Sequence, residues 1–184
     1  MVNEIFKDTQ EKMANVVEHY RKEVATIRTG RANPGLIEPV RVDYYGSMSP
    51  LKNIAQISTP EPQVIVIQPF DPTSLELIET AIINSNVGLT PNNDGNVIRL
   101  NIPTLTEERR KELIKVVHKI IEEGRVSIRN IRRDANDHLK KHEKGHELSE
   151  DNLRRAMDNI QEMTDGHIKE LNQLQESKEE EIMA

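Results

Sequence analysis

The chain has 184 residues, of which 35% are hydrophobic and 30% are charged, with only two Phe, three Tyr and no Trp. This composition gives a thin core and a large solvated surface, which favours long amphipathic helices over a compact globule. The formal net charge is -6, and the absence of cysteine excludes disulfide bonds and thiolate metal sites.

The first residues lack the basic and then apolar order of a signal peptide, and the purest apolar run covers only Val64–Ile67. A membrane helix needs roughly 20 such residues. We therefore expect a cytoplasmic protein that has no membrane partner, and we expect it to act as a monomer.

Three segments show the three- and four-residue apolar period of a helix face. The first covers residues 2–29 and is followed by Gly30, where a C-terminal glycine is expected. The second begins after an N-cap at Thr106 and runs into the early 140s, and the third begins after an N-cap at Ser149. A short junction, 144–148, makes the second and third helices antiparallel neighbours. These patterns predict a long antiparallel three-helix bundle.

The second helix carries apolar or small residues on one face, and we expect this face to be buried. Its members are Leu113, Val117, Ile120, Gly124, Ile128, Ile131, Ala135 and Leu139.

The segment between the first two helices has a different pattern, with three predicted strands. Residues alternate at period two over Val40–Tyr45, Gln63–Gln68 is typical of a buried strand, and Asn96–Ile102 predicts another.

The same segment contains one predicted helix and two predicted loops. Asp71 followed by proline opens a short helix that runs to about Ile83. The turn formers of 46–50 and 91–95 predict loops. The segment is therefore predicted to be a small α+β domain.

We expect residues 1–30 and 105–184 to form the bundle and residues 31–104 to form the inserted domain. Two short links, 29–32 and 103–106, join them. Such links can act as a hinge, because motion between domains is the default unless their interface is large; the alternative is a rigid connection. The candidate hinge residues are Thr29, Gly30, Pro103, Thr104, Leu105 and Thr106.

The sequence His142–His146, HEKGH, matches the H-E-x-x-H pattern of zinc proteases, and His138 adds a histidine at four-residue spacing. Zinc catalysis would need both histidines on one face of a stable helix, a third ligand and a cleft. Gly145 interrupts the motif and a new helix begins just after it, so we interpret the match as chance. The chain also lacks a phosphate-binding loop and a nucleophile elbow. We predict no enzyme activity, no cofactor and no metal site.

Arginines concentrate on the second helix. Arg125, Arg129 and Arg132 fall on one stripe at about 100° per residue, with Arg133 beside it, and the stripe flanks the apolar face. Residues 109–144 contain twelve Lys or Arg and six Asp or Glu, a balance of +6, whereas 145–184 contain four and eleven, a balance of -7.

Two interpretations of the arginines are open. The acidic third helix could supply salt bridges, although exposed pairs contribute only about 0–1 kcal/mol. Alternatively, a rigid row of guanidinium groups suits a phosphate backbone such as that of structured RNA. Glu122 and Glu123 are the only acids between Lys119 and Asp134, which favours an anionic ligand.

Four motifs in order resemble the bacterial-type ribosome recycling factor family from end to end. They are RTGRAN at Arg28–Asn33, VDYYG at Val42–Gly46, LTEERRK at Leu105–Lys111 and VSIRNIRRDAND at Val126–Asp137. The resemblance implies an L-shaped α+β fold, with a three-helix bundle and a small β/α/β domain on a flexible corner.

The resemblance also implies a function in translation. After termination, factors of this family enter the ribosome, and the bundle lies on large-subunit ribosomal RNA across the A and P sites. Elongation factor G with GTP then moves the small domain and splits the ribosome into subunits, which releases it from messenger RNA.

Carried onto this sequence, the resemblance implies that Tyr44–Gly46 lies in the domain that faces elongation factor G. We expect Arg132 to contribute most among the RNA contacts, and the alternative function is a helical-bundle adaptor that binds an acidic protein. The candidate ribosomal RNA contacts are Arg28, Arg31, Arg125, Arg129, Arg132 and Arg133.

Overall fold

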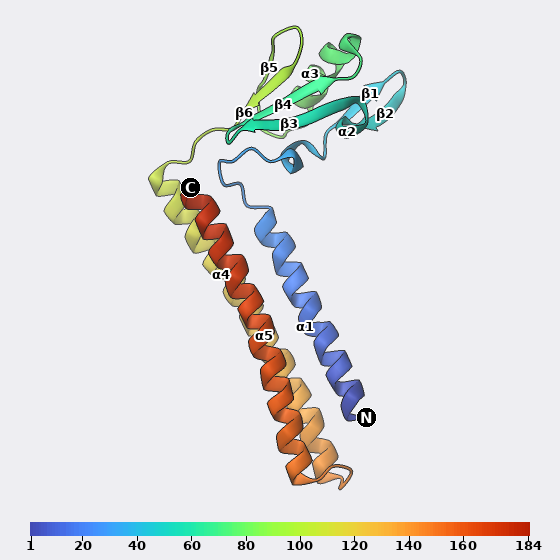
Figure 1. The fold of residues 1–184 in the computed structure, drawn as a ribbon, viewed down its shortest axis with the longest axis vertical. Helices are drawn as coiled ribbons and strands as arrows, with labels where there is room; N and C mark the ends of the chain where they lie inside the picture. Colours follow the sequence, from blue (N-terminus) through green and yellow to red (C-terminus); the bar gives the residue numbers. More distant parts are fainter. The chain divides into compact units, whose positions relative to one another are not determined.

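A computed structural model describes residues 1–184. The chain divides into two compact units, one formed by Met1–Arg28 with Glu107–Ala184 and the other by Thr29–Thr106. Three long helices make the first unit, and a small sheet with short helices makes the second (Figure 1). The predicted α+β class, with a three-helix bundle and an inserted β/α/β domain, is confirmed. No helix is both long and apolar enough to cross a membrane.

The bundle consists of α1 (Val2–Ala25), α4 (Glu107–Lys144) and α5 (Glu150–Met183), and each helix packs against the other two. At 1.5 Å per residue, α4 is about 57 Å long. The predicted start of α5 is confirmed, because the Ser149 hydroxyl accepts a hydrogen bond from the backbone N–H of Asn152 at 3.2 Å.

The predicted end of the first helix is wrong by four residues, since α1 stops at Ala25 and not near 29. Thr26 is the C-cap, and its hydroxyl donates to the carbonyl of Glu23 at 2.6 Å. The next backbone N–H, that of Ile27, bonds only three residues back, to the carbonyl of Val24 at 3.2 Å. Local threonine bonding of this kind competes with the helical pattern. Gly30 is therefore not the C-cap of α1.

The buried face of α4 differs from the prediction at two positions. Ile121 is fully buried, whereas Ile120 and Ile131 are only half-buried. Steps of three and four residues fit either Ile120 or Ile121, so periodicity alone could not choose between them. The buried residues are Leu113, Val117, Ile121, Gly124, Ile128, Ala135 and Leu139.

The three helices meet closely at Gly124. A Cβ atom placed there would lie 3.0 Å from Cδ2 of Tyr20 on α1 and 3.2 Å from Cδ1 of Leu171 on α5. Real Cβ atoms rarely tolerate such contacts, so a glycine at this point lets both neighbouring helices close on α4.

The small unit is built on an antiparallel sheet of four strands in the order β3-β4-β6-β5, with a separate β1-β2 hairpin. Its core contains Ile65 and Ile67 of β4, Ile98 and Leu100 of β6, and Ile78 of α3, all of them fully buried. The elements are η1 (Pro34–Ile37), β1 (Arg41–Tyr44), β2 (Ser47–Pro50), α2 (Leu51–Ile54), β3 (Ala55–Glu61), β4 (Val64–Pro69), η2 (Pro72–Ser74), α3 (Leu75–Asn84), β5 (Pro91–Asn93) and β6 (Ile98–Asn101).

The predicted strands correspond to β1, β4 and β6, but β2, β3 and β5 were missed. β5 was predicted as a loop because its residues are turn formers, yet it pairs with β6 from Pro91↔Leu100 to Asn93↔Ile98. β5 is an edge strand, where proline is tolerated. In β3 only Ala55 is buried, so no apolar alternation marks it.

We expect Gly124→Val to lower the free energy of unfolding by about 1–3 kcal/mol, because the new side chain overpacks the contact among the three helices. The matched control is Gly166→Ala on α5, where a Cβ atom would meet nothing within 4 Å. That change should raise the stability by about 0.5–1 kcal/mol through helix propensity. Denaturant unfolding followed by circular dichroism measures both, and a Gly124→Val protein as stable as wild type would contradict the packing described.

Candidate nucleic-acid interface

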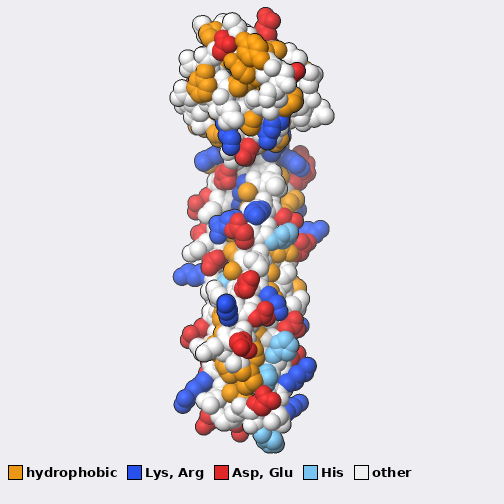
Figure 2. Space-filling view, turned by 90° about the vertical axis from the view of Figure 1, so that its right-hand side faces the viewer, with side chains coloured by type: hydrophobic (Ala, Val, Ile, Leu, Met, Phe, Trp, Pro, Cys, Tyr) orange, Lys and Arg blue, Asp and Glu red, His pale blue; other side chains and the backbone are white.

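Four arginines project from the middle of α4 beside its buried face: Arg125, Arg129, Arg132 and Arg133, here called the arginine face. The side chain of Arg125 is 20% exposed and that of Arg129 is 38% exposed. Arg132 is half-buried and Arg133 is exposed. The row covers eight helical steps, or about 12 Å of helix axis. Figure 2 shows one side of the bundle, on which basic and acidic side chains are interleaved along its length.

The guanidinium group of Arg125 makes two hydrogen bonds to α5 and one ion pair within α4. Its Nε donates to Oδ1 of Asn172 at 2.9 Å, and its Nη2 donates to Oε1 of Gln175 at 2.7 Å. Its Nη1 pairs with Oε2 of Glu122 at 3.0 Å. These three bonds hold the guanidinium group in place, and few of its N–H donors remain free.

Glu122 is the carboxylate that the arginine face shares. Nη2 of Arg129 reaches its Oε1 at 2.6 Å, while Arg125 holds the other oxygen. Hydrogen bonds from Arg125 and then from Arg129 lower the pKa of Glu122 below its ordinary value. Two guanidinium groups thus share one negative charge, and one positive charge remains uncompensated.

Arg132 and Arg133 have no carboxylate partner. Nη1 of Arg132 donates to the amide Oε1 of Gln161 at 3.4 Å, and Arg133 is exposed without a hydrogen bond or ion pair. The hypothesis that acids of the third helix neutralise these arginines is therefore wrong. α5 presents amides to them, and its Glu179 meets the ring of His118 of α4 elsewhere in the bundle.

Arg28 does not lie beside the arginine face. Because Tyr20 of α1 meets Gly124 of α4, and Thr9 lies beside Ala135, the two helices are antiparallel. Arg28 follows the end of α1 and is exposed, so it is level with the first third of α4. Within the bundle, the structure thus separates this candidate from the four arginines.

Arg31 belongs to the small unit, where it is exposed beside a shallow hollow that Glu61 also lines. The six candidate contacts therefore do not form one cluster in either unit. In the VDYYG motif, Tyr45 is 76% exposed whereas Tyr44 packs partly against the core.

The two predicted links lie against each other inside the small unit. Gly30 has a φ of +76°, and a Cβ atom there would lie 3.2 Å from Cγ of Leu105 and 3.5 Å from the carbonyl oxygen of Pro103. The second link is also held to the turn between β3 and β4, because Nε2 of Gln63 donates to the hydroxyl of Thr104 at 3.1 Å. The links are thus packed segments, and glycine is needed at position 30 for both conformation and space.

The histidine-rich motif lies at a helix end. α4 ends at Lys144, inside the motif, and His146 has a φ of +59°. Nδ1 of His142 pairs with Oε2 of Glu147 at 2.7 Å. No group of three or more His, Asp or Glu side chains is arranged to hold a metal ion.

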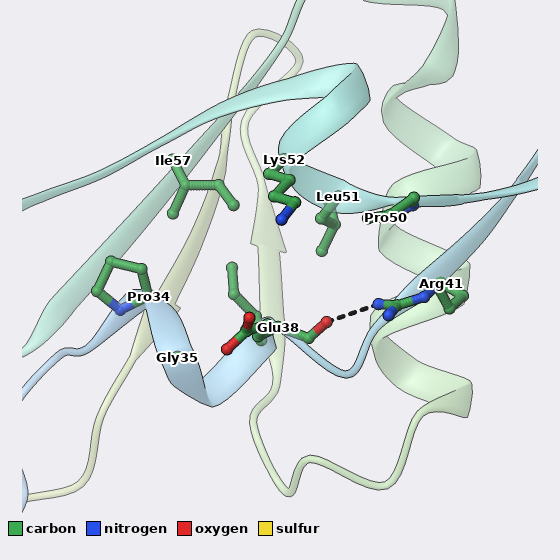
Figure 3. Close-up of a pocket in the computed structure, with 9 residues that line it drawn as sticks. Pro34, Gly35, Glu38, Arg41, Pro50, Leu51, Lys52 and Ile57 are labelled. Carbon is green, nitrogen blue, oxygen red and sulfur yellow. Dashed lines mark hydrogen bonds between the residues drawn. The ribbon is translucent and has the colours of Figure 1, made fainter.

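The small unit also contains an apolar hollow of about 270 Å³ between η1 and α2 (Figure 3). Arg41 is held at its mouth, because its Nη1 donates to the backbone carbonyl of Glu38 at 2.7 Å. The lining offers no serine, threonine or histidine that could act as a nucleophile or general base. It is formed by Pro34, Gly35, Ile37, Glu38, Arg41, Pro50, Leu51, Lys52 and Ile57.

Comparison with known proteins identifies the family. Residues 20–183 match the family described as Ribosome recycling factor. The chain belongs to the ribosome recycling factor family. Curated ribosome-recycling factors that it resembles include one from Halothermothrix orenii, 51% identical over 100% of this chain and 99% of that protein. Another, from Symbiobacterium thermophilum, is 53% identical with the same coverage. The resemblance carried by the four sequence motifs is confirmed.

Solved structures of ribosome recycling factors share the fold. A solution structure of the ribosome recycling factor matches 99% of this chain and 97% of its own, with a TM-score of 0.77 and 45% identity. The second comes from models for the T. thermophilus ribosome recycling factor and the E. coli elongation factor G bound to the E. coli post-termination complex. It covers 100% of both chains, with a TM-score of 0.66 and 46% identity.

In this member of the ribosome recycling factor family, the sequence reasoning missed the amides of α5 that meet the arginines. Gln161, Asn172 and Gln175 are spaced by eleven and three residues, which places them on one helix face. Neutral amides repeated on one face of an acidic helix are a signal that could have been found. The arginines that they bond to could not be found in this way, because the periodicity of each helix does not determine how α4 and α5 align with each other.

Replacing Arg125 with methionine should raise the pKa of Glu122 toward its ordinary value, because the largest cause of the lowering is then absent. Since the folded pKa is lowered, the contribution of this ion pair to stability is present above the ordinary pKa and is lost as pH falls through the lowered value. Carboxyl-carbon NMR titration measures the shift. Arg133→Met is the control and should leave Glu122 unchanged; an unshifted Glu122 in the Arg125 variant would show that the pair does not form.

Proposed function

We propose that this chain recycles ribosomes after termination by placing the arginine face of α4 against phosphates of large-subunit ribosomal RNA at the A and P sites. With elongation factor G and GTP it then splits the post-termination ribosome into subunits and releases it from messenger RNA. The observation that carries the proposal is a row of four arginines on one rigid helix with a single carboxylate among them. Family membership supports it, as does a 46% identical factor described as bound to the post-termination complex.

The arginines differ in how free they are to bind. Arg125 is committed to three partners within the bundle, and Arg129 shares Glu122. Arg132 and Arg133 keep most of their donors for a ligand. Arginine forms bidentate bonds with phosphate oxygens, so we place the main contacts at Arg132 and Arg133. Arg125 acts chiefly by holding the face in position.

Arg28 and Arg31 are proposed as further RNA contacts away from this row. Arginine–phosphate contacts make affinity fall steeply with salt, because each neutralised phosphate releases counterions. The acidic remainder of the chain reduces attraction to other RNA surfaces. An adaptor that binds an acidic protein would not co-sediment with ribosomes, so sedimentation at rising salt separates the two functions.

We also propose that the small unit receives elongation factor G and that the links at Gly30 and Leu105 act as the hinge. GTP hydrolysis belongs to that partner, because the chain has no phosphate-binding loop. The contact of Gly30 with Leu105 and Pro103 couples the two links, so they would move together. Tyr45, which is 76% exposed, lies on the surface available to the partner.

We expect Arg132→Ala to leave the fold intact and to weaken binding to bacterial 50S subunits by on the order of tenfold to a hundredfold, the cost of losing hydrogen bonds to a charged phosphate. Subunit splitting should fall with it. Circular dichroism checks the fold, sedimentation measures binding, and light scattering measures splitting.

The control for this prediction is Arg21→Ala, which removes an exposed α1 arginine paired with Glu18 at 3.3 Å. It should bind and split almost normally. If Arg132→Ala split post-termination ribosomes at the wild-type rate, the anchoring role would be refuted.

Replacing Gly30 with valine should slow splitting more than it weakens binding. Its φ of +76° disfavours a β-branched residue, and the side chain would press on Leu105. Gly95→Val is the control, since it has a φ of +91° in the same unit but a Cβ atom would meet nothing within 4 Å. Binding and splitting are measured with the same assays, and an equal loss of both in the Gly30 variant would argue against a hinge.

A further inference from the structure

The arginine face is bordered along α5 by amides in place of acids. Asn172 and Gln175 accept from Arg125 at 2.9 and 2.7 Å, and Gln161 accepts from Arg132 at 3.4 Å. Asn172 and Gln161 are exposed, and Gln175 is half-buried. All three side chains therefore lie at the surface, where an acid would also be tolerated.

The choice of amides stands out against the rest of the helix. Ten of the 34 residues of α5 are Asp or Glu, and glutamate is a better helix former than asparagine. A carboxylate beside Arg125 or Arg132 would also form a stronger, charge-assisted bond than an amide does. Stability alone would therefore favour acids at these positions.

Gln161 also separates an arginine from an acid. Its Oε1 accepts from Arg132, while its Nε2 donates to Oδ1 of Asp165 at 2.8 Å. The amide thus bonds to the Asp165 carboxylate with one end and to the guanidinium group with the other. Asp165 makes no ion pair with Arg132, although both border the same face.

We propose that Gln161, Asn172 and Gln175 are positioning residues that orient the guanidinium groups of Arg125 and Arg132 while leaving their positive charge available to an anionic ligand. An amide oxygen accepts the hydrogen bond that fixes an arginine, but it adds no charge to cancel the attraction for phosphate. The proposal rests on the proposed function, because it assigns the supporting side chains of the same interface.

The test compares Gln161→Glu with Gln161→Met in the full chain, with purified bacterial 50S subunits as the probe. Both variants lose the donation to Asp165, since an ionised carboxylate cannot donate. Glutamate can still accept the bond from Arg132 but cancels its charge, whereas methionine also removes that bond and leaves the charge. We expect roughly tenfold weaker binding for Gln161→Glu, with the salt slope reduced by about one phosphate contact. For Gln161→Met we expect a loss below about threefold.

The matched control is Gln173→Glu, which makes the same change on an exposed position of α5 that has no hydrogen-bonded partner. It should bind within about twofold of wild type. A second variant, Gln175→Glu, keeps its bond to Arg125 and should unfold at or above the wild-type temperature while binding more weakly. A gain in stability with a loss of affinity is a result that a purely structural role would not produce.

Two outcomes would overturn the proposal. One is wild-type affinity for Gln161→Glu and Gln175→Glu, and the other is a greater loss for Gln161→Met than for Gln161→Glu. In either case, ribosome binding by Arg132→Ala tests the proposed function separately. If Arg132→Ala still binds poorly, the arginine anchor stands and only the role of the amides is lost.

Discussion

The close approach of three helices at Gly124 is the constraint on which the rest of the bundle depends. Tyr20 and Leu171 close on this glycine from two sides, so α1 and α5 both lie against a single face of α4. One consequence is that α4, about 57 Å long, is packed against both other helices of the bundle. Another is that α5 runs beside the arginines at a fixed register, which brings its amides within hydrogen-bond distance. The position of the arginine face relative to α5 therefore depends on this packing.

The bundle could be predicted well because its elements are long and periodic. Ser149 marks the start of α5 because its side-chain oxygen caps the helix. The arginines could be placed on one side of α4 because each residue of an α-helix is rotated by about 100° from the one before. Shorter elements were missed for physical reasons. β5 consists of turn-forming residues that become a strand only by pairing with β6, and β3 buries only Ala55. Helix periodicity could not decide whether Ile120 or Ile121 is the buried residue. The end of α1 was misplaced because the hydroxyl of Thr26 bonds to the backbone there and the helix stops early.

The candidate site was predicted in part. The sequence placed Arg125, Arg129, Arg132 and Arg133 on one face, and four motifs predicted the family. It could not give their partners, because these depend on the register between helices, and it wrongly allowed for acids of α5 as counterions. The structure ranks the four arginines by the donors that each keeps free. It also places the links around Gly30 in contact with each other, which the spacing of the links alone does not imply.

A chain of net charge -6 can thus present a row of four arginines that meets only one carboxylate, Glu122, and we propose that this row binds an anionic ligand. The most direct test of this claim uses the absence of cysteine. A hydroxyl-radical probe is tethered to Asn130→Cys, on the exposed side of α4 between Arg129 and Arg132. The comparison carries the probe at Asn15→Cys on α1, and the sites of cleavage in large-subunit ribosomal RNA are mapped for both. The account predicts strong cleavage at the A and P sites from position 130 and weaker cleavage from position 15. Equal cleavage from both, or stronger cleavage from position 15, would contradict it.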